Sequence, residues 1–162
     1  MVVGAGFAGM YLLHKLRGLG FKVRVFDAAS GVGGTWYWNR YPGARCDVES
    51  YDYSYSFSPE LEQEWRWSER YATQPEILRY INHVADRFDL RRDIAFNTRM
   101  TRAQYDERAA RWTITAADGR QWDAQHFVLC VGQLSTTKTP DYPGQSGFRG
   151  EIIHSGNWPK HE

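Results

Sequence analysis

The strongest constraint on the fold is a glycine-rich turn, Gly4-Ala5-Gly6-Phe7-Ala8-Gly9, which follows a short apolar stub at residues 1–3. An apolar stripe at i, i+3, i+4 and i+7 begins at Gly9 and predicts a helix whose end is marked by Gly18 and Gly20. Residues 21–26 then alternate between apolar and charged side chains, as a strand does. Strand, glycine turn, helix and strand in this order form a βαβ unit, which implies a parallel sheet with a right-handed crossover.

The three glycines of this turn have the spacing that dinucleotide-binding proteins use. Gly4 permits a tight turn out of the strand, Gly6 lets the backbone approach a pyrophosphate, and Gly9 lets the helix pack against the strand. The helix N-terminus adds unpaired N–H groups and the positive end of the helix dipole. Asp27 ends the second strand, where a carboxylate accepts hydrogen bonds from ribose hydroxyls and repels a 2′-phosphate. The pattern predicts FAD or NAD, rather than NADP, at this turn. The alternative is a turn whose glycines serve packing alone.

Beyond Asp27 the sequence predicts an irregular segment, then helices, then short strands. Residues 28–57 show no periodicity but are rich in Gly, Tyr, Trp and Ser, which suits a functional loop. An apolar run at 126–131 is typical of a strand buried on both faces, and 152–153 could begin another strand. Between these segments we expect helices at 59–66 and 74–88, and antiparallel strands at 93–100, 102–106, 111–117 and 121–125 with a hairpin turn at Asp118-Gly119.

Composition and cysteine spacing exclude several classes of partner. The chain has 20 Lys and Arg against 19 Asp and Glu, a formal net charge of +1, which provides no field to attract nucleic acid or a membrane surface. Cys46 and Cys130 lie far apart and have no metal-ligand spacing, so we expect two buried, inert thiols, no metal site and no disulfide. The initial apolar run is too short to span a membrane, and no basic segment precedes it. These features favour a reduced, cytoplasmic protein.

Two further motifs carry a family resemblance. A second glycine run, Gly31-Val32-Gly33-Gly34-Thr35-Trp36, follows Asp27 and could wrap the second half of a dinucleotide, or could be an ordinary surface loop. Near the end of the chain stand Phe148, Gly150, His154, Trp158 and Pro159. Together they resemble the Baeyer–Villiger monooxygenases, class B flavoprotein monooxygenases whose fingerprint is Phe-x-Gly-x-x-x-His-x-x-x-Trp followed by Pro or Asp. Ser155 stands where Thr is usual, and residues 33–47 look closest to phenylacetone and cyclohexanone monooxygenases.

The resemblance implies FAD and NADPH as cofactors and assigns roles to individual residues. Gly4, Gly6 and Gly9 would hold the FAD pyrophosphate, and Asp27 the adenosine ribose. His154 would help to link the FAD and NADP domains. Asp47 would be the catalytic residue, near the flavin, where its counterpart orients an active-site arginine. The other cofactor-binding residues that it implies are Gly34, Thr35, Trp36, Tyr37 and Trp38 beside the flavin, Tyr53 at the cofactor, Met100 at the adenine, and Arg45, Cys46 and Asp47 at the nicotinamide.

Several of these residues also have a plainer interpretation without the resemblance. Asp47 could cap a turn, and Arg45 could be a surface charge. Trp36 and Trp38 could be core or interface rings, and Met100 a core strand residue.

The resemblance predicts an α/β fold: an incomplete, Rossmann-like FAD-binding domain with a parallel sheet and a small antiparallel excursion. We expect residues 1–140 to form this domain, and residues 141–162 to form a linker that carries the fingerprint toward an NADP domain. No second GxGxxG motif occurs in 10–162.

The implied reaction inserts an oxygen atom from O2 next to a ketone carbonyl and gives an ester or lactone. Because this sequence resembles only the amino-terminal part of such enzymes, we expect the chain alone to be inactive. The alternatives are a stand-alone FAD- or nucleotide-binding module, or an NAD-dependent dehydrogenase-type domain. Relatives that hydroxylate nitrogen or oxidise sulfur also stay open.

Overall fold

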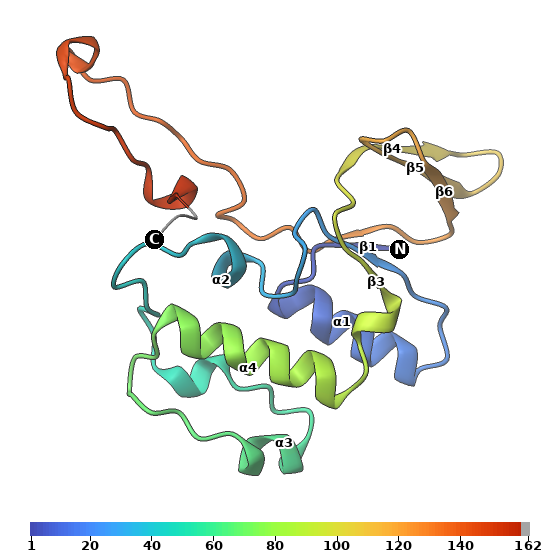
Figure 1. Ribbon diagram of the computed structural model, residues 1–162. Coiled ribbons are helices and arrows are strands. Elements are labelled where there is room, and N and C mark those ends of the chain that lie inside the picture. The colour runs from blue at the N-terminus through green and yellow to red at the C-terminus, as the bar shows by residue number, and fades with distance from the viewer. Residues whose placement is uncertain (160–162) are drawn as a thin grey trace.

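The computed structural model describes residues 1–159 and contains two separate sheets (Figure 1). The predicted α/β architecture, with a parallel sheet and an antiparallel excursion, is confirmed. Its helices and strands are β1 Val2–Val3, α1 Phe7–Gly18, β2 Val25–Phe26, α2 Thr35–Trp38, α3 Pro59–Glu64, α4 Gln74–Arg87, β3 Ile94–Ala95, β4 Met100–Asp106, β5 Arg111–Ala116, β6 Gln121–Ala124 and β7 Val128–Leu129, with 3-10 turns at Ser50–Tyr53, Arg91–Asp93, Gln145–Gly147 and Ser155–Asn157.

The parallel sheet has the strand order β3-β2-β1-β7. Val2 of β1 pairs with Val25 of β2 on one side and with Val128 of β7 on the other. The glycine turn and α1 connect β1 to β2, so the predicted βαβ unit is confirmed. The unit places the end of β1, and therefore the glycine turn, at the carboxyl edge of the sheet, where ligands bind in open α/β folds.

Helices α1 and α4 bury their apolar stripes in one common core. Leu13 of α1 and Tyr80, Ile81 and Val84 of α4 belong to the same buried cluster as Val2. Helix α4 begins with Pro75 in its first turn and ends with Arg87 in its last, which are the favoured residues at those positions. The helices predicted at 59–66 and 74–88 are therefore confirmed, with α3 ending slightly earlier than expected.

Strands β4, β5 and β6 form an antiparallel sheet of their own, drawn at the upper right of Figure 1. The hairpin between β5 and β6 turns at Asp118-Gly119, as predicted, and Gly119 has a φ of +85°. The ring of Trp122 in β6 lies 4.7 Å from the ring of Phe26 in β2, which packs the small sheet onto the end of the parallel one.

Two predicted strands are corrected. The strand at 21–26 is only Val25–Phe26, because β1 offers two residues for pairing, and Phe21 is 53% exposed. The strand at 93–100 is divided in two. Ile94–Ala95 pairs in parallel with β2 and not in an antiparallel sheet, and Met100 begins β4. Asn97 lies between them with a φ of +52°, a left-handed conformation that interrupts a strand.

The apolar segment near the end is also corrected. Within 126–131 only Val128–Leu129 is a strand, and it is the edge strand of the parallel sheet. Leu129 is 61% exposed, so the strand is not buried on both faces by the described residues. Residues 152 and 153 are irregular, and the segment after β7 extends from the body as the orange and red arm of Figure 1. None of the helices described within residues 1–159 is both long and apolar enough to cross a membrane.

Candidate functional site

The glycine turn after β1 has room for no side chain at two of its three glycines. Gly4 has a φ of +106°, and a Cβ there would lie 2.3 Å from the carbonyl oxygen of Cys130. A Cβ on Gly9 would lie 1.8 Å from the carbonyl oxygen of Gly4. These two glycines hold the turn tightly between the first turn of α1 and the end of β7, as the sequence predicts for a phosphate-binding corner.

The second glycine run meets the first. A Cβ on Gly6 would stand 3.4 Å from the Cα of Gly34, and a Cβ on Gly34 would stand 3.0 Å from the Cα of Gly6. The N–H of Gly33 donates to the carbonyl of Ala5 at 3.0 Å. Val32 is buried as well, so the interpretation of 31–36 as an ordinary surface loop is wrong. The two runs form a backbone-lined corner that keeps side chains away.

The N-terminus of α1 opens at this corner without a side-chain cap. Gly6 is the N-cap residue, and the first turn carries no acidic residue. The first N–H groups of a helix have no partner within the helix, and the helix dipole makes this end positive. The corner thus offers backbone donors and positive potential, which is what a phosphate requires.

Asp27 is buried and binds the glycine turn directly. It is 8% exposed, and its two carboxylate oxygens accept hydrogen bonds from the N–H of Ala5 at 2.6 Å and the N–H of Ala29 at 2.8 Å. Each carboxylate oxygen can accept a second hydrogen bond, so the arrangement leaves capacity for ribose hydroxyls. The sequence did not predict the bond from Asp27 to the turn, because a strand-terminal acid gives no sign of its backbone partners.

The segment 97–100 passes beside Asp27. The N–H of Thr98 donates to the carbonyl of Asp27 at 2.8 Å, and the N–H of Asn97 donates to the carbonyl of Ala29 at 2.9 Å. These bonds place the start of β4, and thus Met100, next to the end of β2. The residues predicted at the adenosine end, Asp27 and Met100, therefore belong to adjoining segments.

Helix α2 follows Gly34 and turns Trp36 inward. Trp36 is buried, and its ring meets the ring of Tyr53 edge-on at 5.4 Å. Trp38 is partly exposed, and its ring lies 5.0 Å from the ring of Tyr37. The core-ring interpretation therefore describes Trp36 but not Trp38.

Residues 44–50 lie antiparallel to residues 69–74. Cys46 N–H donates to the carbonyl of Ala72 at 3.0 Å, and an isolated β-bridge joins Arg45 to Thr73. The guanidinium of Arg45 forms a 3.1 Å ion pair with Glu69, and both side chains are about half exposed. Arg45 is therefore an exposed charge paired with Glu69, which agrees with its interpretation as a surface charge.

Asp47 is exposed and lies beside Tyr53. The N-cap residue of the 3-10 turn at Ser50–Tyr53 is Glu49, so Asp47 does not cap that turn. The pKa of the Tyr53 phenol is raised, first by its burial and then by the nearby Cys46 and Asp47. Asp47 thus brings negative charge close to Tyr53, whose ring packs against the buried Trp36.

The fingerprint residues lie in the arm and not at the glycine corner. A Cβ on Gly150 would stand 2.5 Å from the ring tip of Phe148, so the Phe-x-Gly spacing lets the ring lie over the backbone. His154 Nδ1 accepts a hydrogen bond from the N–H of Gly156 at 3.0 Å, and Trp158 and Pro159 are half-buried. These contacts give His154 a local structural role.

The two cysteines differ in burial. Cys46 is buried, whereas Cys130 is half-buried, so the prediction of two buried thiols is wrong for Cys130. Burial raises the pKa of the Cys130 thiol.

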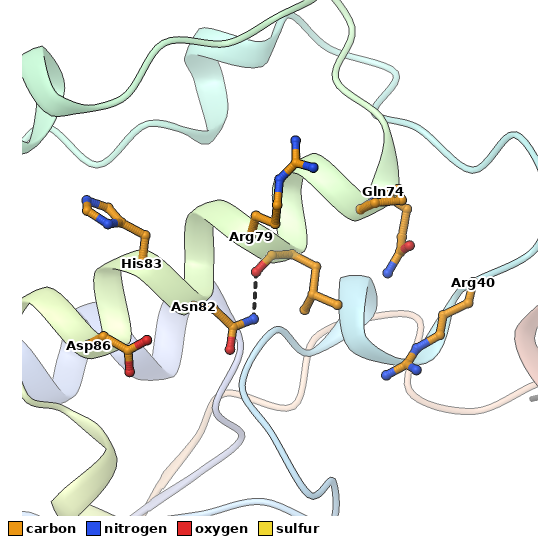
Figure 2. Close-up of a pocket in the computed structure, with 8 residues that line it drawn as sticks. Arg40, Gln74, Arg79, Asn82, His83 and Asp86 are labelled. Atoms are coloured by element: carbon orange, nitrogen blue, oxygen red, sulfur yellow. Dashed lines mark hydrogen bonds between the residues drawn. The ribbon is translucent and has the colours of Figure 1, made fainter.

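Residues 1–159 contain no group of three His, Cys, Asp or Glu that could hold a metal ion. A hollow of about 580 Å³ lies along α4 and is lined by Arg40, Gln74 and Asn82 among others (Figure 2). None of the residues predicted to bind a cofactor lines it.

Comparison with known proteins identifies similar chains. Residues 2–66 match the family of NAD(P)-binding Rossmann-like domains. An acetone monooxygenase (methyl acetate-forming) of Gordonia sp. strain TY-5 is 54% identical over 98% of this chain and 30% of its own length. A phenazine N-monooxygenase of Lysobacter antibioticus is 51% identical over 98% of this chain and 30% of its own length. A Baeyer–Villiger monooxygenase of Pseudooceanicola batsensis is 50% identical over 99% of this chain and 30% of its own length.

Solved structures give the same result. An oxidized steroid monooxygenase bound to NADP superposes with a TM-score of 0.90 at 62% identity, over 98% of this chain and 30% of that one. A cyclohexanone monooxygenase from Rhodococcus sp. Phi1, also bound to NADP+, superposes with a TM-score of 0.92 at 48% identity, over 99% of this chain and 30% of that one. The chain thus spans about 30% of the length of the proteins that it matches.

Proposed function

We propose that this chain, which is homologous over its whole length to the amino-terminal part of the Baeyer–Villiger monooxygenases, forms the FAD-binding portion of an FAD- and NADPH-dependent monooxygenase. The reaction that we assign to the complete enzyme transforms a ketone into an ester or lactone. One atom of O2 enters the bond next to the carbonyl, the other leaves as water, and NADPH provides the electrons. Residues 1–140 would form the FAD-binding part, and residues from 141 on the linker that carries the fingerprint.

The observation that carries this proposal is the corner where Gly6 and Gly34 meet at the uncapped N-terminus of α1. A Cβ on Gly34 would press on the backbone of Gly6, and the spacing of Gly4, Gly6 and Gly9 is the one that lets the backbone approach a dinucleotide pyrophosphate. Asp27 lies next to this corner with acceptor capacity for ribose hydroxyls, and α2 continues from it with a buried tryptophan. The residues present therefore fit FAD.

The same geometry suggests which residues would hold each part of FAD. Gly4, Gly6 and Gly9 would hold the pyrophosphate by keeping this turn tight at the N-terminus of α1, whose first N–H groups would donate to it, and Asp27 would bind the ribose. The backbone near Met100 would meet the adenine. The flavin would lie beside Gly34, Thr35, Trp36, Tyr37, Trp38 and Tyr53.

When bound, FAD supplies the electron-transfer and oxygen-activating chemistry that amino-acid side chains lack. The buried ring of Trp36 and the half-buried ring of Tyr53 would exclude water from its vicinity. Asp47 would hold an arginine in position by its charge, and such an arginine stabilises negative charge that develops during the reaction. Arg45, Cys46 and Asp47 would border the nicotinamide of NADPH, with Arg45 fixed by its ion pair with Glu69.

A titration of the 162-residue chain with FAD, followed by flavin fluorescence, tests the assignment. Gly6→Ala should weaken binding about tenfold, which corresponds to roughly 1.4 kcal/mol, because a Cβ there would stand at the contact between the glycine turn and Gly34. Gly18→Ala is the matched control, since a Cβ at Gly18 meets nothing within 4 Å. Equal titration curves for the wild type and both variants would contradict the proposal.

A ketone assay tests whether the chain by itself is competent. With FAD, NADPH and cyclohexanone, we expect no lactone from the 162-residue chain, because the sequence holds one glycine-rich dinucleotide turn and two cofactors need binding. Lactone formation with stoichiometric NADPH oxidation would contradict this expectation.

A second candidate reaction is oxygenation of an aromatic nitrogen. The phenazine N-monooxygenase is 51% identical to this chain, against 54% for the acetone monooxygenase, so the two relatives are almost equally similar. A panel of ketones and aromatic N-heterocycles, offered to the full-length enzyme, separates the two reactions by their products.

A further inference from the structure

Gln74 is a buried polar residue that bonds to two separate segments of the candidate site. It is the first residue of α4 and only 7% exposed. Its side-chain Nε2 donates to the carbonyl oxygen of Trp36, and its backbone N–H donates to the carbonyl of Ala44 at 2.8 Å. Figure 2 shows its amide directed away from the axis of α4. A single residue thus connects α2 with the segment that leads to Arg45 and Asp47.

The shortness of α2 explains why Trp36 needs this donor. The helix ends at Trp38, and its last backbone bond runs from the N–H of Asn39 to the carbonyl of Thr35. The carbonyl of Trp36 is therefore one of the terminal groups that a helix leaves without an internal partner. A buried carbonyl without a donor is costly, and the Gln74 amide supplies that donor.

The backbone bond of Gln74 fixes the second segment. Next to it, Cys46 N–H donates to the carbonyl of Ala72, which extends the contact toward Asp47. Trp36, Cys46, Ala72 and Ile77 then pack into one buried cluster. The distance between the Trp36 turn and residues 44–47 is therefore set through the N-terminus of α4, and the side chain of Gln74 is the link to the Trp36 side.

We propose that Gln74 is a positioning residue that holds the Gly34–Trp38 turn in register with Arg45–Asp47 and so shapes the flavin side of the cofactor site. This inference rests on the proposed function for its consequence, but the hydrogen bond can be tested without any cofactor. A glutamine that merely fills space would be replaceable by methionine, which has a similar length and shape and no donor.

The first test is hydrogen exchange of the 162-residue chain at the amides of Trp38 and Asn39. Gln74→Met should speed their exchange by up to about tenfold, the range expected for the loss of one hydrogen bond. In Gln74→Glu the neutral acid can donate to the Trp36 carbonyl and the carboxylate cannot. Protection should therefore approach the wild-type value at low pH and fall at high pH, after correction for intrinsic exchange rates. Gln63→Glu, at an exposed position in α3, is the matched control.

The second test is the FAD dissociation constant of the same variants. Gln74→Met should weaken FAD binding. In Gln74→Glu, FAD binding should become weaker as pH rises, whereas Gln63→Glu should bind FAD as the wild type does. Unchanged exchange in Gln74→Met would overturn the inference. Altered exchange with unchanged affinity, in a wild-type chain that binds FAD, would overturn the positioning role. A wild-type chain that binds no FAD would contradict the proposed function, and the exchange data would still decide whether Gln74 holds the turn.

Discussion

The glycine turn at Gly4–Gly9 and the arm that carries Phe148–Pro159 each contain a glycine motif, but different physical requirements explain the two. At Gly9 a Cβ would collide with the carbonyl of Gly4, which is backbone and cannot move aside. At Gly150 a Cβ would meet only the tip of the Phe148 ring, and that side chain is 62% exposed. The turn is therefore determined by backbone contacts within the described residues, whereas large apolar side chains of the arm, such as Phe148 and Ile152, are more than half exposed.

The largest effect should come from Gly9→Ala, which would place a methyl group 1.8 Å from a backbone oxygen. We expect a loss of roughly 3 kcal/mol in the free energy of unfolding, as for severe overpacking. Gly150→Ala should cost well under about 1 kcal/mol, because the Phe148 ring can rotate away. Urea denaturation of both variants measures the difference. Equal losses in the free energy of unfolding for Gly9→Ala and Gly150→Ala would contradict this difference between the glycine turn and the arm.

The next effect concerns Asp27, which binds the turn to the end of β2. Asp27→Asn keeps the shape but replaces one acceptor oxygen by an NH2 group, so either the Ala5 or the Ala29 N–H loses its partner. We expect a loss of about 2 kcal/mol, in the range for a hydrogen bond to a charged group. Asp141→Asn, at an exposed position in the arm, is the control, and chemical denaturation is the measurement. A loss no larger than that of the control would contradict the role of Asp27.

A smaller effect involves Tyr55, whose hydroxyl donates to the carbonyl of Phe7 at 2.6 Å in the first turn of α1. Tyr55→Phe should cost about 1 kcal/mol at neutral pH. Burial, and then the nearby Tyr80, raise the pKa of Tyr55 in the folded chain. The unfolded state therefore loses its phenolic proton first as pH rises above about 10, and stability decreases there.

The contribution of Tyr55 to the alkaline loss of stability can be measured by comparing the wild type with Tyr55→Phe. Thermal unfolding between pH 8 and 11 should show a shallower alkaline loss in Tyr55→Phe than in the wild type. Some loss should persist, because burial also raises the pKa values of Tyr53 and Tyr80. Identical slopes for the two proteins would contradict the assignment to Tyr55.

The smallest effect should come from His154 in the arm. His154→Ala removes the ring nitrogen that accepts the Gly156 N–H, and the cost of losing such a cap is about 1 kcal/mol or less. Because the arm is separate from the glycine corner, the FAD dissociation constant of the 162-residue chain should not change. A marked loss of FAD affinity would show that the arm belongs to the same binding unit as the turn.

Local patterns were enough to predict much of this fold. The stripe after Gly9 and the one containing Ile77, Tyr80 and Val84 predicted α1 and α4, because helical periodicity is written within one segment. Asp118-Gly119 predicted its hairpin for the same reason. The glycine turn was also predictable, because strand, turn, helix and terminal acid are consecutive.

Long-range choices were not predictable from the same signals. That Ile94 pairs in parallel with β2, and that Leu129 lies on an exposed edge, depend on which segments meet, and hydrophobicity does not specify the partner. Gln74 gave no signal at all, because its partners are backbone carbonyls of residues far away in the sequence. Buried polar residues whose partners are backbone atoms need a structure to be recognised.

The most direct test of the central claim is the effect of FAD on amide exchange at residues 7–9, the first turn of α1. If the glycine corner binds the pyrophosphate, FAD should slow exchange at these three amides in the 162-residue chain and leave the arm turns at 145–147 and 155–157 unchanged. If FAD slows exchange equally in the glycine corner and the arm, or slows it in neither, the claim that the glycine corner binds FAD is contradicted.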